Sequence, residues 1–240
     1  IKVDTISENT SANGVAIDSV TLKDGGVTGT AAIVAGGGNG PTLGFQLKDT
    51  SGNAQPRLTN DANNDTVIRP GASGRAIMLA NYANNATAIN VDDSGHVTKP
   101  LQPAFVATNS VAQSNLSTNT AHTIQLNSET YDVNSDFNTS TYKFTSPVTG
   151  KYQLNFVCRL DAIPSDYNFL QISIVTSNRS YIMTLDGGRR DGGDLIRYTG
   201  SVLADMDSSD TAHLTVYQNT GTAATDIVAS CTTFSGFLAC

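Results

Sequence analysis

The stretch Phe137–Phe156, FNTSTYKFTSPVTGKYQLNF, decides the fold of this protein. A turn signal at Pro147–Gly150 divides it into two short runs of strand-forming residues. The second run continues to Cys158 as KYQLNFVC, and apolar residues occupy every second position. A period of two places Tyr152, Leu154, Phe156 and Cys158 on one face of a half-buried strand. This pattern predicts antiparallel β structure with one face against a core.

Similar short runs continue on both sides of this stretch through residues 101–240. They alternate with turn signals and hold most of the aromatic residues of the chain. We expect strands at Phe105–Ala107, His122–Leu126, Tyr142–Phe144, Lys151–Cys158, Phe169–Val175, Tyr181–Leu185, Val202–Ala204, His213–Tyr217 and Ile227–Leu238. Strands at such intervals are typical of an antiparallel jelly roll of eight to ten strands. A domain of this length buries about two thirds of its unfolded surface, which is enough for an independent core.

The first hundred residues have fewer large apolar side chains than the rest of the chain. Phe45 and Tyr82 are their only aromatic residues, and short strand-like runs are separated by turns rich in Gly and Asn. The join falls at Thr98–Pro103, where two prolines disfavour helix and central strand. We therefore predict three parts: a junction or stem segment at 1–30, a β-stem at 31–100 and a jelly-roll domain at 101–240.

The front part lacks enough apolar surface for a monomeric sandwich. In Ser11–Gly26, SANGVAIDSVTLKDGG, strand periodicity is confined to Val15, Ile17, Val20 and Leu22. Two isolated strands are marginal in water, and exposed strand edges favour aggregation. Three copies winding about one axis would supply the missing partner surface, so we expect an intertwined trimeric stem. The alternative is a flexible linker with incidental β propensity.

Composition excludes several classes of protein. The chain has 240 residues and a net charge of −7, whereas nucleic-acid binding requires clustered Lys and Arg. Its apolar runs are shorter than the ~18 residues of a membrane span, so we expect neither nucleic acid nor membrane insertion. The odd count of three cysteines fits a reducing cytoplasm, with Cys158 and Cys231 as small core residues; the alternative is one disulfide plus a free thiol, with Cys240 as the third cysteine. Ile1 is not a native start, so we expect a processed or excised chain.

The residues that catalysis would need do not converge in the sequence. His96, His122 and His213 lie in separate contexts without ligand-spaced carboxylates or thiols. The chain lacks the Gly-x-Ser-x-Gly elbow of a serine nucleophile, and the glycine-rich run Ala35–Pro41 lacks the Lys-Ser/Thr of a phosphate loop. We therefore expect a protein that is not an enzyme and has no cofactor, calcium excepted.

The stretch Phe137–Phe156 resembles the signature of complement globular-head and tumour-necrosis-factor-like jelly rolls. The residues in register are Phe137, Asn138, Phe144, Pro147, Gly150, Tyr152 and Phe156. Leu154 stands where the family often has Phe. QPAFVA at Gln102–Ala107 is similar to the family's first strand, and FSGFL, from Phe234, is similar to its closing strand. The resemblance implies a TNF-like sandwich that trimerises through its apolar faces. Together with the front part, this predicts an all-β chain in which a trimeric β-stem or β-prism precedes the sandwich.

Two further segments resemble the fibres of viruses. Ile1–Val27 is similar to the junction segment of tail fibres of bacteriophages and large viruses, although Ser19 replaces the usual Gly. Val91–Pro100, VDDSGHVTKP, resembles the last turn of a fibre stem before its tip. This likeness implies a homotrimeric viral tail fibre, assembled in the host cytoplasm, that joins upstream tail proteins. Its tip would bind a host cell-surface glycan or protein during adsorption.

Leu185–Leu195, LDGGRRDGGDL, is the most informative polar cluster. The resemblance implies that loops 161–168, 186–195 and 219–226 emerge at the end of the domain remote from the stem. Receptor contacts are then expected from Asp166, Tyr167, Asp186, Arg189, Arg190, Asp191 and Asp194. A calcium ion at Asp186, Asp191 and Asp194 is a further possibility. The alternative is a solvated loop whose charges cancel.

Two other functions remain open for a chain of this build. One is a structural trimerisation or decoration module without a receptor. The other is a bacterial trimeric adhesin on the cell surface.

Overall fold

The computed structural model describes residues 45–48, 54–60, 66–68, 77–80, 86–186 and 195–240. The chain forms two compact units, Ile1–Ser73 and Gly74–Cys240. The predicted junction segment and its apolar residues Val15, Ile17, Val20 and Leu22 lie outside the described residues. In the described part of the chain, no helix is long and apolar enough to cross a membrane.

The first unit contains a small antiparallel sheet in the order β1-β2-β3. Its strands are β1 (Phe45–Lys48), β2 (Ala54–Asn60) and β3 (Thr66–Ile68). The sequence did not predict β2, since Pro56 lies within it. Pro56 pairs with Gln46, next to a register irregularity of β1. Proline is tolerated at such irregular positions because one ladder hydrogen bond is already missing there.

The second unit begins with a three-stranded antiparallel sheet of β4 (Ile77–Ala80), β5 (Thr87–Val91) and β6 (Val97–Thr98). The turn between β5 and β6 is built on Asp92. Its Oδ1 accepts hydrogen bonds from the backbone N of Ser94 at 2.9 Å and of His96 at 2.8 Å. Gly95 has a φ of 86°, which favours glycine. This sheet agrees with the short strand-like runs expected in this part of the chain, and the trimeric stem stays a prediction.

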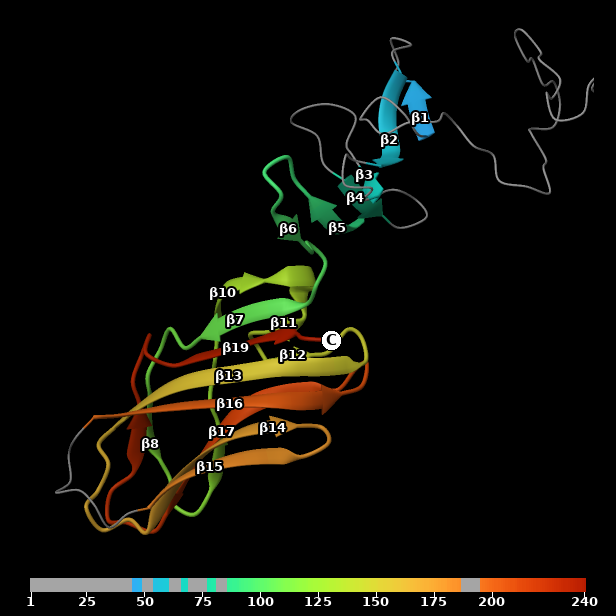
Figure 1. Ribbon diagram of the computed structural model, residues 1–240. Helices are drawn as coiled ribbons and strands as arrows, with labels where there is room; N and C mark the ends of the chain where they lie inside the picture. The colour runs from blue at the N-terminus through green and yellow to red at the C-terminus, as the bar shows by residue number, and fades with distance from the viewer. Residues whose placement is uncertain (1–44, 49–53, 61–65, 69–76, 81–85, 187–194) are drawn as a thin grey trace, which may run out of the picture. The chain divides into compact units, whose positions relative to one another are not determined.

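The rest of the second unit is an antiparallel jelly-roll sandwich (Figure 1). Its strands are β7 (Ala104–Thr108), β8 (Gln113–Leu116), β9 (Ala121–Thr123), β10 (Ser128–Asp132), β11 (Phe137–Asn138), β12 (Lys143–Thr145), β13 (Gly150–Asp161), β14 (Phe169–Thr176), β15 (Ser180–Asp186), β16 (Ile196–Met206), β17 (Thr211–Asn219), β18 (Thr225–Ile227) and β19 (Thr233–Leu238). One sheet is seven-stranded, in the order β10-β7-β19-β13-β18-β8 with β16 paired to β13. The other is six-stranded, in the order β11-β12-β17-β14-β15 with β9 paired to β17.

Strand β13 is the centre of the seven-stranded sheet. It pairs with β16 along Gly150–Leu160 and with β19 along Tyr152–Val157. Its even-numbered residues from Tyr152 to Leu160 are buried, and its odd-numbered residues are not. The predicted alternation of Lys151–Cys158 is therefore confirmed, and it places the core between the two sheets.

Phe105 lies at the centre of an aromatic cluster in this core. Its ring centroid is 4.6 Å from that of Phe144, 5.3 Å from that of Phe137 and 5.2 Å from that of Phe234. Phe144 is in turn 5.4 Å from Tyr152. These rings come from both sheets, so the cluster joins the two layers. Offset and edge-to-face ring pairs add stability beyond the area that they bury.

The other signature residues shape the β12–β13 region. Tyr152 is fully buried, and its hydroxyl donates to the carbonyl oxygen of Val148 at 2.8 Å. A Cβ at Gly150 would lie 2.6 Å from Cδ1 of Leu238 and 2.7 Å from the carbonyl oxygen of Cys240, so a side chain does not fit. Asn138 Oδ1 accepts from the backbone N of Ser140 and Thr141. Pro147 is exposed in the turn, while Phe156 and Phe234 are buried.

One predicted strand is shorter in the structure and another is divided. The strand expected at His122–Leu126 ends at Thr123, although Ile124 and Leu126 are fully buried. The strand expected at Ile227–Leu238 is divided into β18 and β19 around Asn109. The buried Asn109 side chain donates to the carbonyl oxygen of Val228 at 2.8 Å and accepts from the backbone N of Thr232 at 3.0 Å. A polar side chain from another strand therefore supplies hydrogen bonds that a continuous ladder would have made.

The cysteines are free thiols in three different environments. Cys158 is fully buried, Cys231 is half-buried and Cys240 is exposed. Burial raises the pKa of the Cys158 thiol to about 12, while a hydrogen bond from Thr232 opposes the shift. Cys158 is therefore an unreactive core residue, as expected from the sequence.

Asp136, next to β11, offers a test of pH dependence. Burial, and then the charge of Asp132, raise the pKa of its carboxyl group. A raised carboxyl pKa means that stability is lost as the pH rises through the folded-state value. Asp136→Asn should therefore raise the Tm near pH 7, by about 1–3 °C, and the gain should shrink toward pH ~4. Thermal unfolding over this pH range, with Asp93→Asn in an exposed turn as control, measures it. An equal gain at both ends of the range would contradict the assignment.

Candidate functional site

The strand register defines two ends of the jelly roll. At the base, Ala104 pairs with Phe237 and Gly150 with Met206. At the apex, Leu160 pairs with Ile196 and Phe169 with Asn219. The segments 162–168 and 220–224 connect strands at the apex, opposite the end where residue 104 enters (Figure 1). Asp186 and Ile196, which end β15 and begin β16, pair with Phe169 and Leu160 at the same end. Of the predicted loops, the described parts of 161–168 and 219–226 lie at this end, whereas most of 186–195 lies outside the described residues.

Asp166 ties two apical loops together. Its Oδ1 accepts from the backbone N of Thr222 at 2.9 Å and from the Thr222 hydroxyl at 3.2 Å. The side chain is exposed. One carboxylate oxygen of Asp166 therefore holds the 220–224 loop, and the predicted receptor contact of Asp166 stays a prediction.

Tyr167 was predicted to contact a receptor, but its ring is buried, so this prediction is wrong for the ring. Tyr167 is only 4% exposed and belongs to the same buried cluster as Ile163. The loop between β13 and β14 turns two apolar side chains into the core, and a loop position alone did not indicate this. Tyr167 supports the loop from below instead of presenting its ring to a ligand.

Most of the charged segment Leu185–Leu195 lies outside the described residues, and this includes Arg189, Arg190, Asp191 and Asp194. Asp186 is the last residue of β15 and pairs with Phe169 of β14 at the apex. Among the described residues, no three His, Cys, Asp or Glu side chains form a group suited to a metal ion. Calcium at Asp186, Asp191 and Asp194 therefore stays a prediction.

A third described loop at the apex, Ser117–Thr120 between β8 and β9, was not predicted as part of the site. Asn119 donates its backbone N–H to the carbonyl oxygen of Gln218 at 2.7 Å. Asn119 Oδ1 accepts from the backbone N of Thr220 and from Nδ2 of Asn219, both at 3.2 Å. The run SNLSTNT signals a turn, but its place at the apex follows from the pairing of β8 with β18 and of β9 with β17.

The apex is held by a buried amide. Gln218 is 3% exposed, and its Nε2 donates to the carbonyl oxygens of Thr220 at 2.9 Å and Ala223 at 2.8 Å. Its Oε1 accepts from the backbone N of Thr225 at 3.0 Å. The 220–224 loop is therefore fixed from below by one side chain. Binding residues on such supported loops keep their geometry when a ligand arrives.

The outward side of the seven-stranded sheet is a second candidate surface. Paired residues share a face, so Leu203 and Phe237 lie on either side of Gln153, and Tyr131 lies beside Val106. Leu203 is 54%, Phe237 46% and Tyr131 51% exposed. We call the five residues Val106, Tyr131, Gln153, Leu203 and Phe237 the outward patch. Exposed apolar side chains gathered on one sheet face are typical of protein–protein contact.

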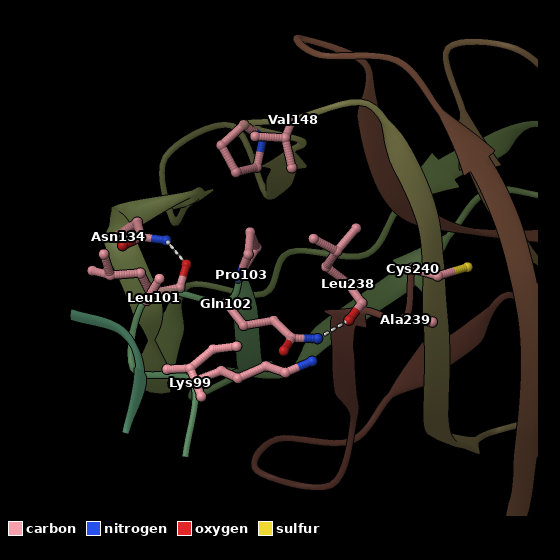
Figure 2. A pocket seen from close by; sticks show the side chains of 12 residues that line it. Lys99, Leu101, Gln102, Pro103, Asn134, Val148, Leu238, Ala239 and Cys240 are labelled. Atoms are coloured by element: carbon pink, nitrogen blue, oxygen red, sulfur yellow. Dashed lines mark hydrogen bonds between the residues drawn. The ribbon is translucent and has the colours of Figure 1, made fainter. Parts of the chain in front are cut away.

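A pocket of about 480 Å³ opens at the base (Figure 2). Leu101, Pro103, Val148 and Leu238 give it an apolar lining, and Gln102 donates from Nε2 to the carbonyl oxygen of Leu238. Its lining residues include Cys240 and Lys99 but no Asp, Glu or His. An acid–base pair is therefore missing from this pocket, which lies at the end opposite the converging loops.

The three histidines stay apart. His96 contacts Asp92 in the β5–β6 turn, with Nδ1 2.9 Å from Oδ2. His122 lies 3.2 Å from the hydroxyl of Ser117. Burial, and then Lys143, lower the pKa of His213. These positions are structural or exposed, and the expectation of a non-enzymatic protein stays a prediction.

Comparisons with known proteins agree with the jelly roll. The family model of the C1q domain matches residues 104–239. The globular domain of zebrafish complement 1qA has 16% identity and a TM-score of 0.44, with 58% of this chain and 98% of that chain covered. A crystal structure of murine APRIL at pH 8.0 has 8% identity and a TM-score of 0.41, with 57% and 98% covered. No curated protein matches the chain.

Proposed function

Because this chain belongs to the C1q domain family, we propose that it works as a homotrimer whose apex binds a receptor on a cell surface. The observation that carries the proposal is the arrangement of the two surfaces. Three of the described loops, 117–120, 162–168 and 220–224, contact one another at the apex, whereas the outward patch lies along a sheet and leaves the apex free.

The outward patch supports self-association. Its exposed side chains are Tyr131, Leu203 and Phe237, and none is charged. The cores of protein–protein interfaces are enriched in aromatic residues and depleted in charged ones. At its centre Gln153 Nε2 donates to the Ser201 hydroxyl at 2.7 Å, and that hydroxyl donates to Asn155 Oδ1 at 2.9 Å. These polar groups satisfy one another, so covering them costs less than covering unpaired groups. C1q/TNF-like domains form homotrimers, which fits this face.

The viral part of the proposal rests on sequence. Ile1–Val27 and Val91–Pro100 resemble segments of tail fibres, and a stem in front of a trimeric head suits a fibre tip. We propose a virion tail fibre that adsorbs to host cells, with a glycan or protein as receptor and upstream tail proteins as further partners. Three apices per fibre raise avidity without new contacts. The proposed role is binding and not catalysis.

Charge reversal in the apical segment tests receptor binding. Arg189→Glu and Arg190→Glu should each weaken binding of the full chain to its receptor roughly tenfold. Each change removes guanidinium donors for hydroxyls or anions and introduces a carboxylate that repels anions. Arg179→Glu is the matched control, since Arg179 is exposed in the β14–β15 turn at the base. A glycan array and adsorption to candidate host cells measure the effect.

The same experiment separates the rival functions. Unchanged adsorption of both apical variants, with the oligomer intact, would contradict the proposed role of Arg189 and Arg190. Failure of the wild-type chain to bind any glycan or cell would favour a structural trimerisation module. If the chain is found on the surface of bacteria and not on a virus particle, its binding would favour an adhesin.

A further inference from the structure

Two aromatic rings stand on the outward side of the six-stranded sheet near the apex. Phe169 of β14 and Tyr217 of β17 lie in adjacent rows of the register, where Phe169 pairs with Asn219 and Gln171 with Tyr217. Their ring centroids are 5.9 Å apart, with 30° between the planes. Both are half-exposed and neither joins the buried core cluster, to which their neighbours Leu170 and Val216 belong. The core therefore does not explain these rings.

Amide side chains surround the rings and hold one another in place. Asn168 Nδ2 donates to Asn219 Oδ1 at 2.9 Å, and Asn219 Nδ2 lies 3.4 Å from the Tyr217 hydroxyl. In the same row as Tyr217, Gln171 Nε2 donates to the Thr184 hydroxyl at 3.3 Å. These bonds fix the orientation of the amides before any ligand binds, which lowers the entropy lost on binding.

These aromatic and amide side chains have hydrogen-bond donors and acceptors that they do not use among themselves. Each amide offers two donors and an acceptor with two lone pairs, and a hydroxyl both donates and accepts. Within the described part of the chain, the hydroxyl proton of Tyr217 and Oε1 of Gln171 have no hydrogen-bond partner. The six residues Phe169, Tyr217, Gln171, Thr184, Asn168 and Asn219 carry no formal charge. The cluster therefore suits a ligand that is neutral, rich in hydroxyls and apolar on one face.

We propose that these six residues, the amide–aromatic cluster, bind an uncharged pyranose unit of a glycan. The C–H face of the sugar ring packs on Phe169 and Tyr217, and its hydroxyls bond to the amides and the tyrosine hydroxyl. The inference rests on the proposed receptor binding and gives it a site and a ligand chemistry. It differs from the Arg189–Arg190 segment, which suits an anionic group. The competing explanation is an aromatic cross-strand pair that only stabilises the sheet.

The absence of Trp from the sequence allows a direct test. Tyr217→Trp would introduce a single indole at the cluster, whose fluorescence reports a sugar stacking on it. The full chain is titrated with maltohexaose, cellohexaose and chitohexaose as neutral probes and with sialyllactose as an anionic probe. We expect a saturable emission change with at least one neutral probe. Val111→Trp, at an exposed position in the β7–β8 loop, is the control and should show none.

Calorimetry then measures binding of the same probe to the chain with its own sequence, which has no Trp. Phe169→Ala and Tyr217→Ala should each weaken it at least ~10-fold, while Tyr217→Phe, which keeps the ring, should weaken it less. Thermal unfolding checks that each variant is folded, and Gln171→Ala replaces any alanine variant that is not. Neutral-glycan binding that survives all of these changes would overturn this site but leave receptor binding intact. Binding of only the anionic probe would also overturn it, and binding of no probe or cell would overturn the proposed function itself.

Discussion

Phe105→Ala should lower the free energy of unfolding of the jelly roll by about 3–5 kcal/mol. Phe105 is fully buried and contacts three other rings, from β11, β12 and β19. Alanine would leave a cavity that these rings cannot fill without leaving their own positions, because protein interiors are close-packed. Urea unfolding at fixed protein concentration, followed by circular dichroism, measures the change.

Val111→Ala is the control for this prediction. Val111 is 62% exposed, so the same type of truncation should change stability by less than ~0.5 kcal/mol. A loss below ~1 kcal/mol for Phe105→Ala would mean that the aromatic cluster does not join the two sheets, and the description of the core would be wrong.

Phe237→Glu should dissociate the trimer while the jelly roll stays folded. Phe237 is 46% exposed in the single chain, so a carboxylate there meets water and costs little in the monomer. In the trimer it would be covered, at a cost of about 2 kcal/mol or more per chain. Three chains contribute at once, so the trimer dissociation constant should rise roughly 10⁴-fold. Sedimentation velocity at micromolar concentration measures the species present.

Ile182→Glu is the matched control. Ile182 is 58% exposed but lies on β15 of the other sheet, so the trimer should persist. Dissociation by both variants would indicate a general effect of charge. A trimer that survives Phe237→Glu but not Ile182→Glu would place the interface on the six-stranded sheet.

The jelly roll could be predicted from sequence where a single strand carries a clear period. Lys151–Cys158 alternates and became the centre of β13. The same rule underestimated β16, expected only at Val202–Ala204, because Gly200 and Ser201 weaken its pattern. A Cβ at Gly200 would lie 2.3 Å from Cε1 of Phe156, so this glycine is required by packing against another strand. Contacts between strands are not visible in the local pattern.

The apex shows the same limit for the site. Its loops were predicted from the resemblance to the jelly-roll family, in which antiparallel strands alternate in direction and leave these connections at one end. The direction of individual side chains was not predictable, and Tyr167 points into the core. Phe169 and Tyr217 stack because the register of β14 with β17 aligns them. Such a register is set by tertiary pairing, so the amide–aromatic cluster could be found only in the structure.

Threefold self-association is the central claim, and sedimentation equilibrium of the full chain at nanomolar concentration tests it most directly. If three copies assemble, we expect a single species with the mass of three 25.1 kDa chains, with the jelly roll folded by circular dichroism. A folded species with the mass of one chain at that dilution would contradict it.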